Sequence, residues 1–176
     1  MVNWIIGIPL LTLFASVALA TVVIPSTRRE PARLTLNILL VLIVLWTFCS
    51  VMFHSIAFPS SLFWMYSILG CGLFTGAVGV HFTTQFTGQN GAIAKWLVAI
   101  FYIFSSLLLV PLFSGKVATG ATLLPNGTVE VNFGPMAPFM WGIVTFAALA
   151  AIAILILALV RPRLVEGNKY AIFPLV

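Results

Sequence analysis

The two histidines, His54 and His81, are the side chains of this sequence best suited to ligate a metal or to carry a proton. His81 lies in the stretch VGVHFTTQFTG, where threonines and a glutamine interrupt an otherwise apolar segment. Each histidine has two interpretations. It is either a cofactor ligand, for example to haem or chlorophyll, or a neutral structural residue that is hydrogen-bonded to a nearby hydroxyl or carbonyl group. The position of each histidine in the fold decides between them.

The amino-acid composition indicates the kind of protein in which these histidines lie. Of the 176 residues, 62% are hydrophobic and only 6% are charged, whereas an ordinary soluble domain has about 25% charged residues. Several apolar runs approach or exceed the roughly 20 residues that cross a bilayer. The sequence therefore predicts an integral membrane protein with the lipid bilayer as its main partner. The net charge of +5 is spread over short connections and forms no clustered patch, so nucleic acid is not an expected partner.

The elements that must position the histidines are five expected transmembrane helices, at about 3–25, 35–57, 61–86, 94–113 and 136–160. The predicted fold class is an all-α five-helix transmembrane bundle spanning residues 1–163, followed by a cytoplasmic tail, 164–176. The outer loop 114–135 carries two β-prone runs around Asn126-Gly127, a strong hairpin signal. We therefore expect a small extracytoplasmic β-hairpin between the fourth and fifth helices.

Charge sets the expected orientation and, with it, the depth of each histidine. Seven of the eight lysines and arginines fall on one side of the predicted bundle, and only Lys116 falls on the other. The positive-inside rule then places the N-terminus outside and the C-terminus in the cytoplasm of a multi-pass cell-membrane protein. His54 lies near the outer surface and His81 near the inner one, about 25 Å apart in depth. One haem cannot bind both, so any pigment or haem site at either histidine needs a partner-supplied environment. For His81 the structural interpretation is preferred.

Small residues mark a second feature of the third helix. Gly72 and Gly76 form a small-xxx-small pair, with Gly79 near the same face, and such residues let helices approach closely in lipid. We expect this face to contact another helix, either within the bundle or from a partner. Cys49 and Cys71 both fall in apolar segments; buried free thiols are the preferred interpretation, and a disulfide between neighbouring helices is the alternative.

Catalytic chemistry is not expected. The chain has no aspartate, and its three glutamates lie in connections or the tail, whereas ion-coupled transporters and proton pumps place carboxylates inside the membrane. The sequence also shows no phosphate-binding loop, no metal-spaced Cys/His cluster and no nucleophile with a plausible base. We predict that the protein is not an enzyme and has no catalytic or metal-binding residues.

Trp46, the run FWMYSILGCGLF leading into VHFTTQFTG, and Gly134-Pro135 before an apolar helix together resemble a known membrane module. Residues 1–163 resemble the first five helices of the N-terminal seven-transmembrane sensor region of bacterial and archaeal histidine kinases. The sequence carries neither that family's two further helices nor its phosphoacceptor and ATP-binding domains. The resemblance therefore implies a sensory or binding module, with a ligand pocket beneath the outer hairpin.

Three functions remain open on the sequence alone. The first is the sensor-like module, which binds a ligand or a partner protein. The second is an accessory transmembrane subunit of a larger respiratory or photosynthetic complex, in which Tyr170 and Phe173 of the tail dock against other membrane subunits. The third and weakest is a small transporter.

The expected orientation predicts the behaviour of reporter fusions. A reporter joined after Arg163 should report a cytoplasmic position, and one inserted within 116–130 an extracytoplasmic position, because the cations lie on the cytoplasmic side. The opposite result at either site would overturn the assigned topology, and the assigned depths of His54 and His81 with it.

Overall fold

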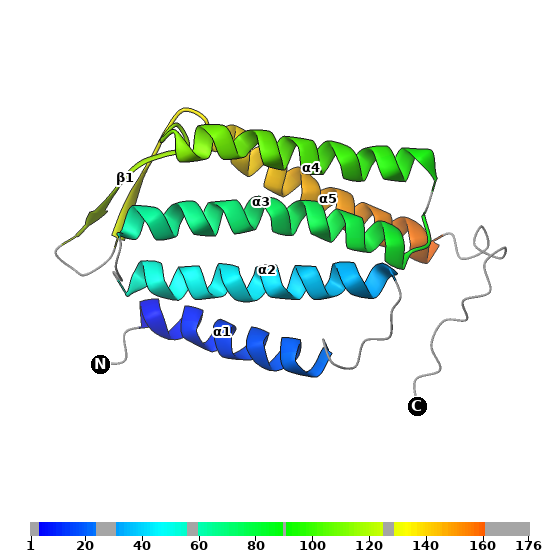
Figure 1. The fold of residues 1–176 in the computed structure, drawn as a ribbon, viewed down its shortest axis with the longest axis horizontal. Coiled ribbons are helices and arrows are strands. Elements are labelled where there is room, and N and C mark those ends of the chain that lie inside the picture. The colour runs from blue at the N-terminus through cyan, green and yellow to red at the C-terminus, as the bar shows by residue number, and fades with distance from the viewer. Residues whose placement is uncertain (1–3, 24–30, 56–59, 90, 125–128, 161–176) are drawn as a thin grey trace.

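The computed structural model describes residues 4–23, 31–55, 60–89, 91–124 and 129–160. It contains five long helices and one small antiparallel sheet, arranged in the order shown in Figure 1. The elements are α1 (Trp4–Val23), α2 (Pro31–His54), α3 (Ser61–Phe86), α4 (Ala92–Phe113), β1 (Ala118–Leu123), β2 (Val129–Phe133) and α5 (Ala137–Val160). The predicted helical bundle with a small two-stranded antiparallel sheet is confirmed, and it fits a helical membrane protein.

Four helices, α2 to α5, are long and apolar enough to cross a membrane. α1 contributes a shorter apolar stretch, Gly7–Val22. The crossing of the membrane by α1 therefore stays a prediction. Apolar runs of this kind form helices in lipid because a helix satisfies every backbone hydrogen-bonding group within the segment. The four helices fit a multi-pass membrane protein.

Local residue types explain where α2 and α3 begin and end. α2 starts at Pro31, four residues earlier than expected, because proline at the first helical position removes only an N–H group that would lack a partner anyway. Ser60 caps α3 by accepting a hydrogen bond from the backbone N–H of Phe63 at 3.2 Å. After α3, Gly88 adopts a positive φ of 69°, which a residue with a side chain rarely adopts.

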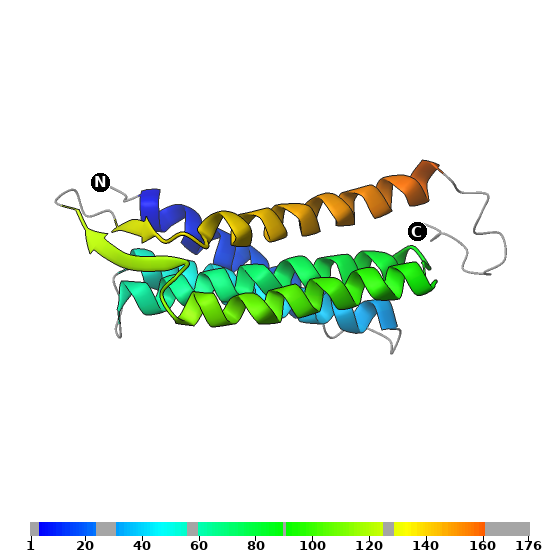
Figure 2. The same ribbon diagram turned by 90° about the horizontal axis from the view of Figure 1, so that it is seen from above.

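α3 lies at the centre of the arrangement. It packs against α2, α4, α5 and β1, whereas α1 packs mainly against α2. Figure 1 shows α2 and α4 on either side of α3, and Figure 2 shows α5 as a separate layer against α3. The remaining elements are thus positioned largely through one helix.

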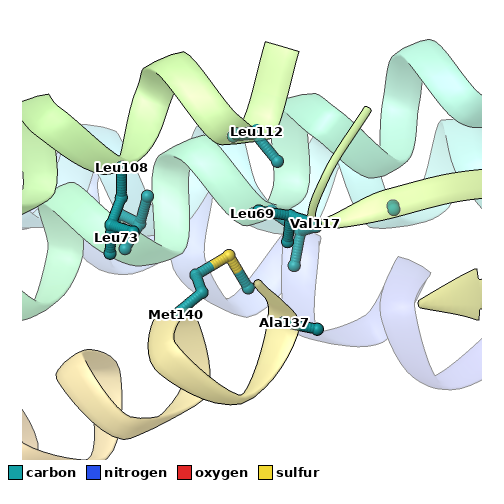
Figure 3. Packing of buried hydrophobic residues seen from close by; sticks show 8 residues of the cluster. Leu69, Leu73, Leu108, Leu112, Val117, Ala137 and Met140 are labelled. Carbon is teal, nitrogen blue, oxygen red and sulfur yellow. The ribbon is translucent and has the colours of Figure 1, made fainter. Parts of the chain in front are cut away.

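A hydrophobic cluster joins the hairpin end of the bundle to α3 (Figure 3). Leu73 and Leu112 are almost fully buried, and Met140 of α5 directs its side chain between them and Val117 at the start of the hairpin. The complete buried cluster consists of Leu69, Leu73, Leu108, Leu112, Val117, Ala118, Ala137 and Met140. It fixes the position of the hairpin relative to three helices.

The hairpin itself is anchored by backbone contacts. β1 and β2 pair antiparallel, with an irregularity in register between Ala118 and Gly120. The Tyr66 hydroxyl of α3 donates to the Ala118 carbonyl at 2.9 Å. Gly134 is required here, because a side chain at that position would collide with the Lys116 carbonyl. The expected turn at Asn126-Gly127 lies outside the described residues.

The three glycines singled out on α3 differ in their surroundings. A Cβ atom built on Gly76 would lie 3.0 Å from the Cβ of Ala147 on α5, closer than most such contacts. A Cβ atom on Gly72 or Gly79 would meet nothing within 4 Å. Close approach of α3 and α5 therefore depends on Gly76. A second buried cluster lies next to this contact and consists of Ala77, Val80, Phe101, Ala147 and Ile154.

Replacing Gly76 with Leu is expected to destabilise the bundle by about 1–3 kcal/mol, because the larger side chain forces α3 and α5 apart. Thermal melting of the purified protein in detergent measures the effect. Gly76→Ala and Gly72→Ala form a matched pair, because both add a methyl group and both gain helix propensity of up to about 1 kcal/mol. Gly76→Ala should melt at a lower temperature than Gly72→Ala, because only its methyl group crowds Ala147. Equal melting of all these variants and the parent would show that α3 and α5 do not need this contact.

Candidate functional site

Four polar side chains from three helices form a continuous hydrogen-bonded chain, called here the His81 chain. His81 Nδ1 lies 3.3 Å from the Tyr102 hydroxyl of α4. His81 Nε2 lies 2.9 Å from Gln85 Nε2, one turn further along α3. The Thr35 hydroxyl of α2 donates to Gln85 Oε1 at 2.9 Å. The His81 chain therefore connects α2, α3 and α4 at the end of the bundle opposite the hairpin.

The helices bring these groups together for local reasons. His81 and Gln85 are four residues apart, so their side chains lie on the same face of α3. α2 begins at this end of the bundle, which places Thr35 beside them. Tyr102 lies ten residues into α4, which runs alongside α3 (Figure 1), and its hydroxyl meets the His81 ring from there. Thr35 is buried, with an exposed fraction of 5%, so water competes little for its hydroxyl group.

The donor and acceptor atoms define which group donates in each hydrogen bond of the His81 chain. With the Gln85 amide oriented as in this structure, its Nε2 donates to His81 Nε2, and the proton of the neutral ring resides on Nδ1. Nδ1–H then donates to the Tyr102 oxygen. This arrangement leaves the hydroxyl proton of Tyr102 available to a further acceptor, such as a ligand oxygen. Interhelical hydrogen bonds of this type stabilise membrane helices by about 0.6 kcal/mol each on average.

The structure places the two candidate cofactor ligands at separate sites. The ring of His54 packs edge-on against Phe53, with 5.1 Å between ring centroids. The antiparallel register of α2 and α3 puts His54 level with Tyr66, about 22 Å along α3 from His81. Both nitrogens of His81 already have hydrogen-bonding partners. Binding a haem iron or chlorophyll magnesium at His81 would therefore cost one of these bonds.

A groove of about 460 Å³ lies beside the His81 chain. Thr84 of α3 lines it and donates its hydroxyl to the His81 carbonyl at 2.8 Å. Figure 2 shows α5 leaning away from α3 and α4 towards its C-terminal end, where Ile154 lines the groove. The lining residues are Thr84, Gly88, Gln89, Gly91, Ile93, Ala94, Leu97 and Ile154. The groove is open and largely apolar.

Docking residues in the tail and metal-ligating clusters are two further kinds of candidate site. Tyr170 and Phe173, the expected docking residues of the tail, lie outside the described residues. Within the described ranges, His, Cys, Asp and Glu side chains do not gather in groups of three that could hold a metal ion.

The sequence points to His81 but not to its three hydrogen-bonding partners, Thr35, Gln85 and Tyr102. Gln85 could have been recognised from its spacing of four residues on the same helix. Thr35 and Tyr102 could not, because they lie on helices whose rotation about their own axes is set by packing. Comparison of the chain with protein-family models, curated proteins and solved structures finds no match.

The direction of the His81 chain predicts the tautomer of the ring. In a His54→Gln variant, which leaves His81 as the sole histidine, ¹⁵N NMR of the neutral ring should show the proton on Nδ1. Gln85→Glu removes the amide donor and offers only carboxylate acceptors, so it should move a proton onto Nε2. If Nδ1 and Nε2 carry the same protons in both proteins, residue 85 does not contact the ring as described.

Proposed function

We propose that this protein is a non-catalytic membrane module that acts by binding a ligand or a partner protein. The likeness of its sequence to the sensor region of histidine kinases supports this function. The structural observation that carries it is the double role of α3. One end of α3 holds the hairpin through Tyr66 and Leu69, and the other end holds the His81 chain. A change at the hairpin would reach the opposite end of the bundle along a single continuous helix.

The proposal includes a five-crossing topology with the N-terminus outside the cell and the C-terminus in the cytoplasm. In the described residues, Arg33 and Lys95 lie at the end of the bundle that carries the His81 chain, and Lys116 lies at the hairpin end. With the positive-inside rule, this distribution supports a hairpin that meets the outer medium and a His81 chain near the inner surface. Ligand binding at the hairpin would then be sensed near the cytoplasm.

Coupling between the two ends of α3 can be tested with matched hydroxyl-removing variants in the His54→Gln background. Tyr66→Phe removes the hydroxyl that holds Ala118 of the hairpin, and should therefore shift the ¹⁵N signals of the His81 ring. Ser67→Ala removes a neighbouring hydroxyl that donates to the Phe63 carbonyl within α3, and should leave these signals in place. Unchanged His81 signals in Tyr66→Phe would contradict transmission along α3.

The second candidate function is an accessory subunit of a larger respiratory or photosynthetic membrane complex. The open groove between α5 and the α3–α4 end favours it, because a helix or a flat pigment from a neighbouring subunit could occupy that space. Extraction from native membranes in mild detergent, followed by an absorption spectrum and mass spectrometry, separates the two functions. A coloured, multi-subunit particle supports the accessory subunit, and a colourless isolated chain supports the sensor-like module.

A further inference from the structure

Two thiols from neighbouring helices meet within the apolar part of the bundle. Cys49 of α2 and Cys71 of α3 are both free cysteines. Their side chains lie close enough to influence each other. Cys49 is buried, with an exposed fraction of 7%, whereas Cys71 is partly exposed.

The register of α2 and α3 places these cysteines opposite each other by an independent route. In two antiparallel helices, facing residues have a constant sum of residue numbers, because both rise by about 1.5 Å per residue. The hydrogen bond between Thr35 and Gln85 gives a sum of 120, and Cys49 and Cys71 give the same sum. Cys49 lies two heptads from Thr35 on α2, and Cys71 lies two heptads from Gln85 on α3. Over two heptads the direction of a side chain around the helix axis changes by only about 40°. Both pairs therefore lie along the same interhelical contact.

The position of this pair restricts the oxidants that can reach it. Cys71 lies ten residues into α3, about 15 Å from the hairpin end of that helix. The surface around it is apolar, and the partly exposed Cys71 is the accessible member of the pair. A charged, water-soluble oxidant is excluded from such a surface by its desolvation cost. A lipid-soluble oxidant is not.

We infer that Cys49 and Cys71 form a redox-active dithiol that a membrane-dissolved quinone converts to an interhelical disulfide. Two S–H bonds break and one S–S bond forms. The quinone accepts the two electrons and the two protons and becomes a quinol. A dithiol reductant returns the pair to the free thiols. The dithiol goes beyond the proposed function, because it lets the protein respond to the oxidation state of membrane quinones without any ligand at the hairpin.

The disulfide would act on the same contact that the His81 chain uses. It ties α2 to α3 covalently, so α2 can no longer slide or rotate against α3. The Thr35–Gln85 hydrogen bond, further along the contact, is then held in its present register. Oxidation would lock the bundle in the arrangement that the reduced protein adopts here, and reduction would restore the freedom of α2 to move against α3.

The test uses the full-length chain in liposomes and tetramethyl-1,4-benzoquinone, a quinone whose fully substituted ring has no free position for thiol addition. After treatment, the protein is denatured, alkylated with N-ethylmaleimide and weighed intact by mass spectrometry. The reduced parent should carry two maleimide adducts, and the oxidised parent should carry none and remain a monomer. Dithiothreitol should restore both adducts. Cys49→Ser and Cys71→Ser should each keep one adduct before and after the quinone.

Three results would overturn the inference. Two maleimide adducts after quinone treatment would show that the dithiol is not oxidised by a lipid-soluble quinone. A doubled mass would show that the thiols pair between chains instead of within one. Loss of the single adduct from Cys49→Ser or Cys71→Ser after quinone treatment would show that the loss of adducts does not require both cysteines of one chain.

Discussion

Close packing on the surface of α3 is the constraint on which the rest of the structure depends. Lipid tails are as apolar as the helix surfaces, so the hydrophobic effect does not drive these helices together, and they associate through close contact and hydrogen bonds. α3 supplies both. Gly76 admits α5 through Ala147, and the Leu73 carbonyl accepts a hydrogen bond from the buried Ser105 of α4 at 3.1 Å. The hairpin and the His81 chain occupy the two ends of the helix that these contacts hold in place.

In the proposed function, this arrangement gives one helix two inputs and one readout. The hairpin would act on one end of α3 through Tyr66, and the dithiol would act along its contact with α2 through Cys71. The His81 chain would report on the opposite end, because a small rotation of α3 moves His81 relative to both Thr35 and Tyr102. Function by binding fits such a structure, since the polar groups serve to connect helices.

Much of the fold could be predicted from the sequence, because length and hydropathy define membrane helices almost alone. α3 has the expected bounds, and the alternating runs on either side of Asn126-Gly127 predicted the paired strands β1 and β2. The early start of α2 differs from the prediction because Pro31 fits the first position of a helix as well as it fits a connection. The contacts between helices were less predictable: Gly76 meets α5 while the equally small Gly72 faces open space. Hydropathy has no helical period here, so the sequence does not reveal which face of each helix turns inward.

Residue-resolved amide hydrogen exchange in detergent micelles tests the central role of α3 most directly, because exchange rates report how firmly each helix is held. The slowest exchange is expected along α3, between Leu69 and Thr84, and the fastest among the helices in α1, which packs mainly against α2. Exchange in α1 that is as slow as in α3 would contradict the central role of α3. So would an α3 that exchanges more rapidly than both α2 and α4.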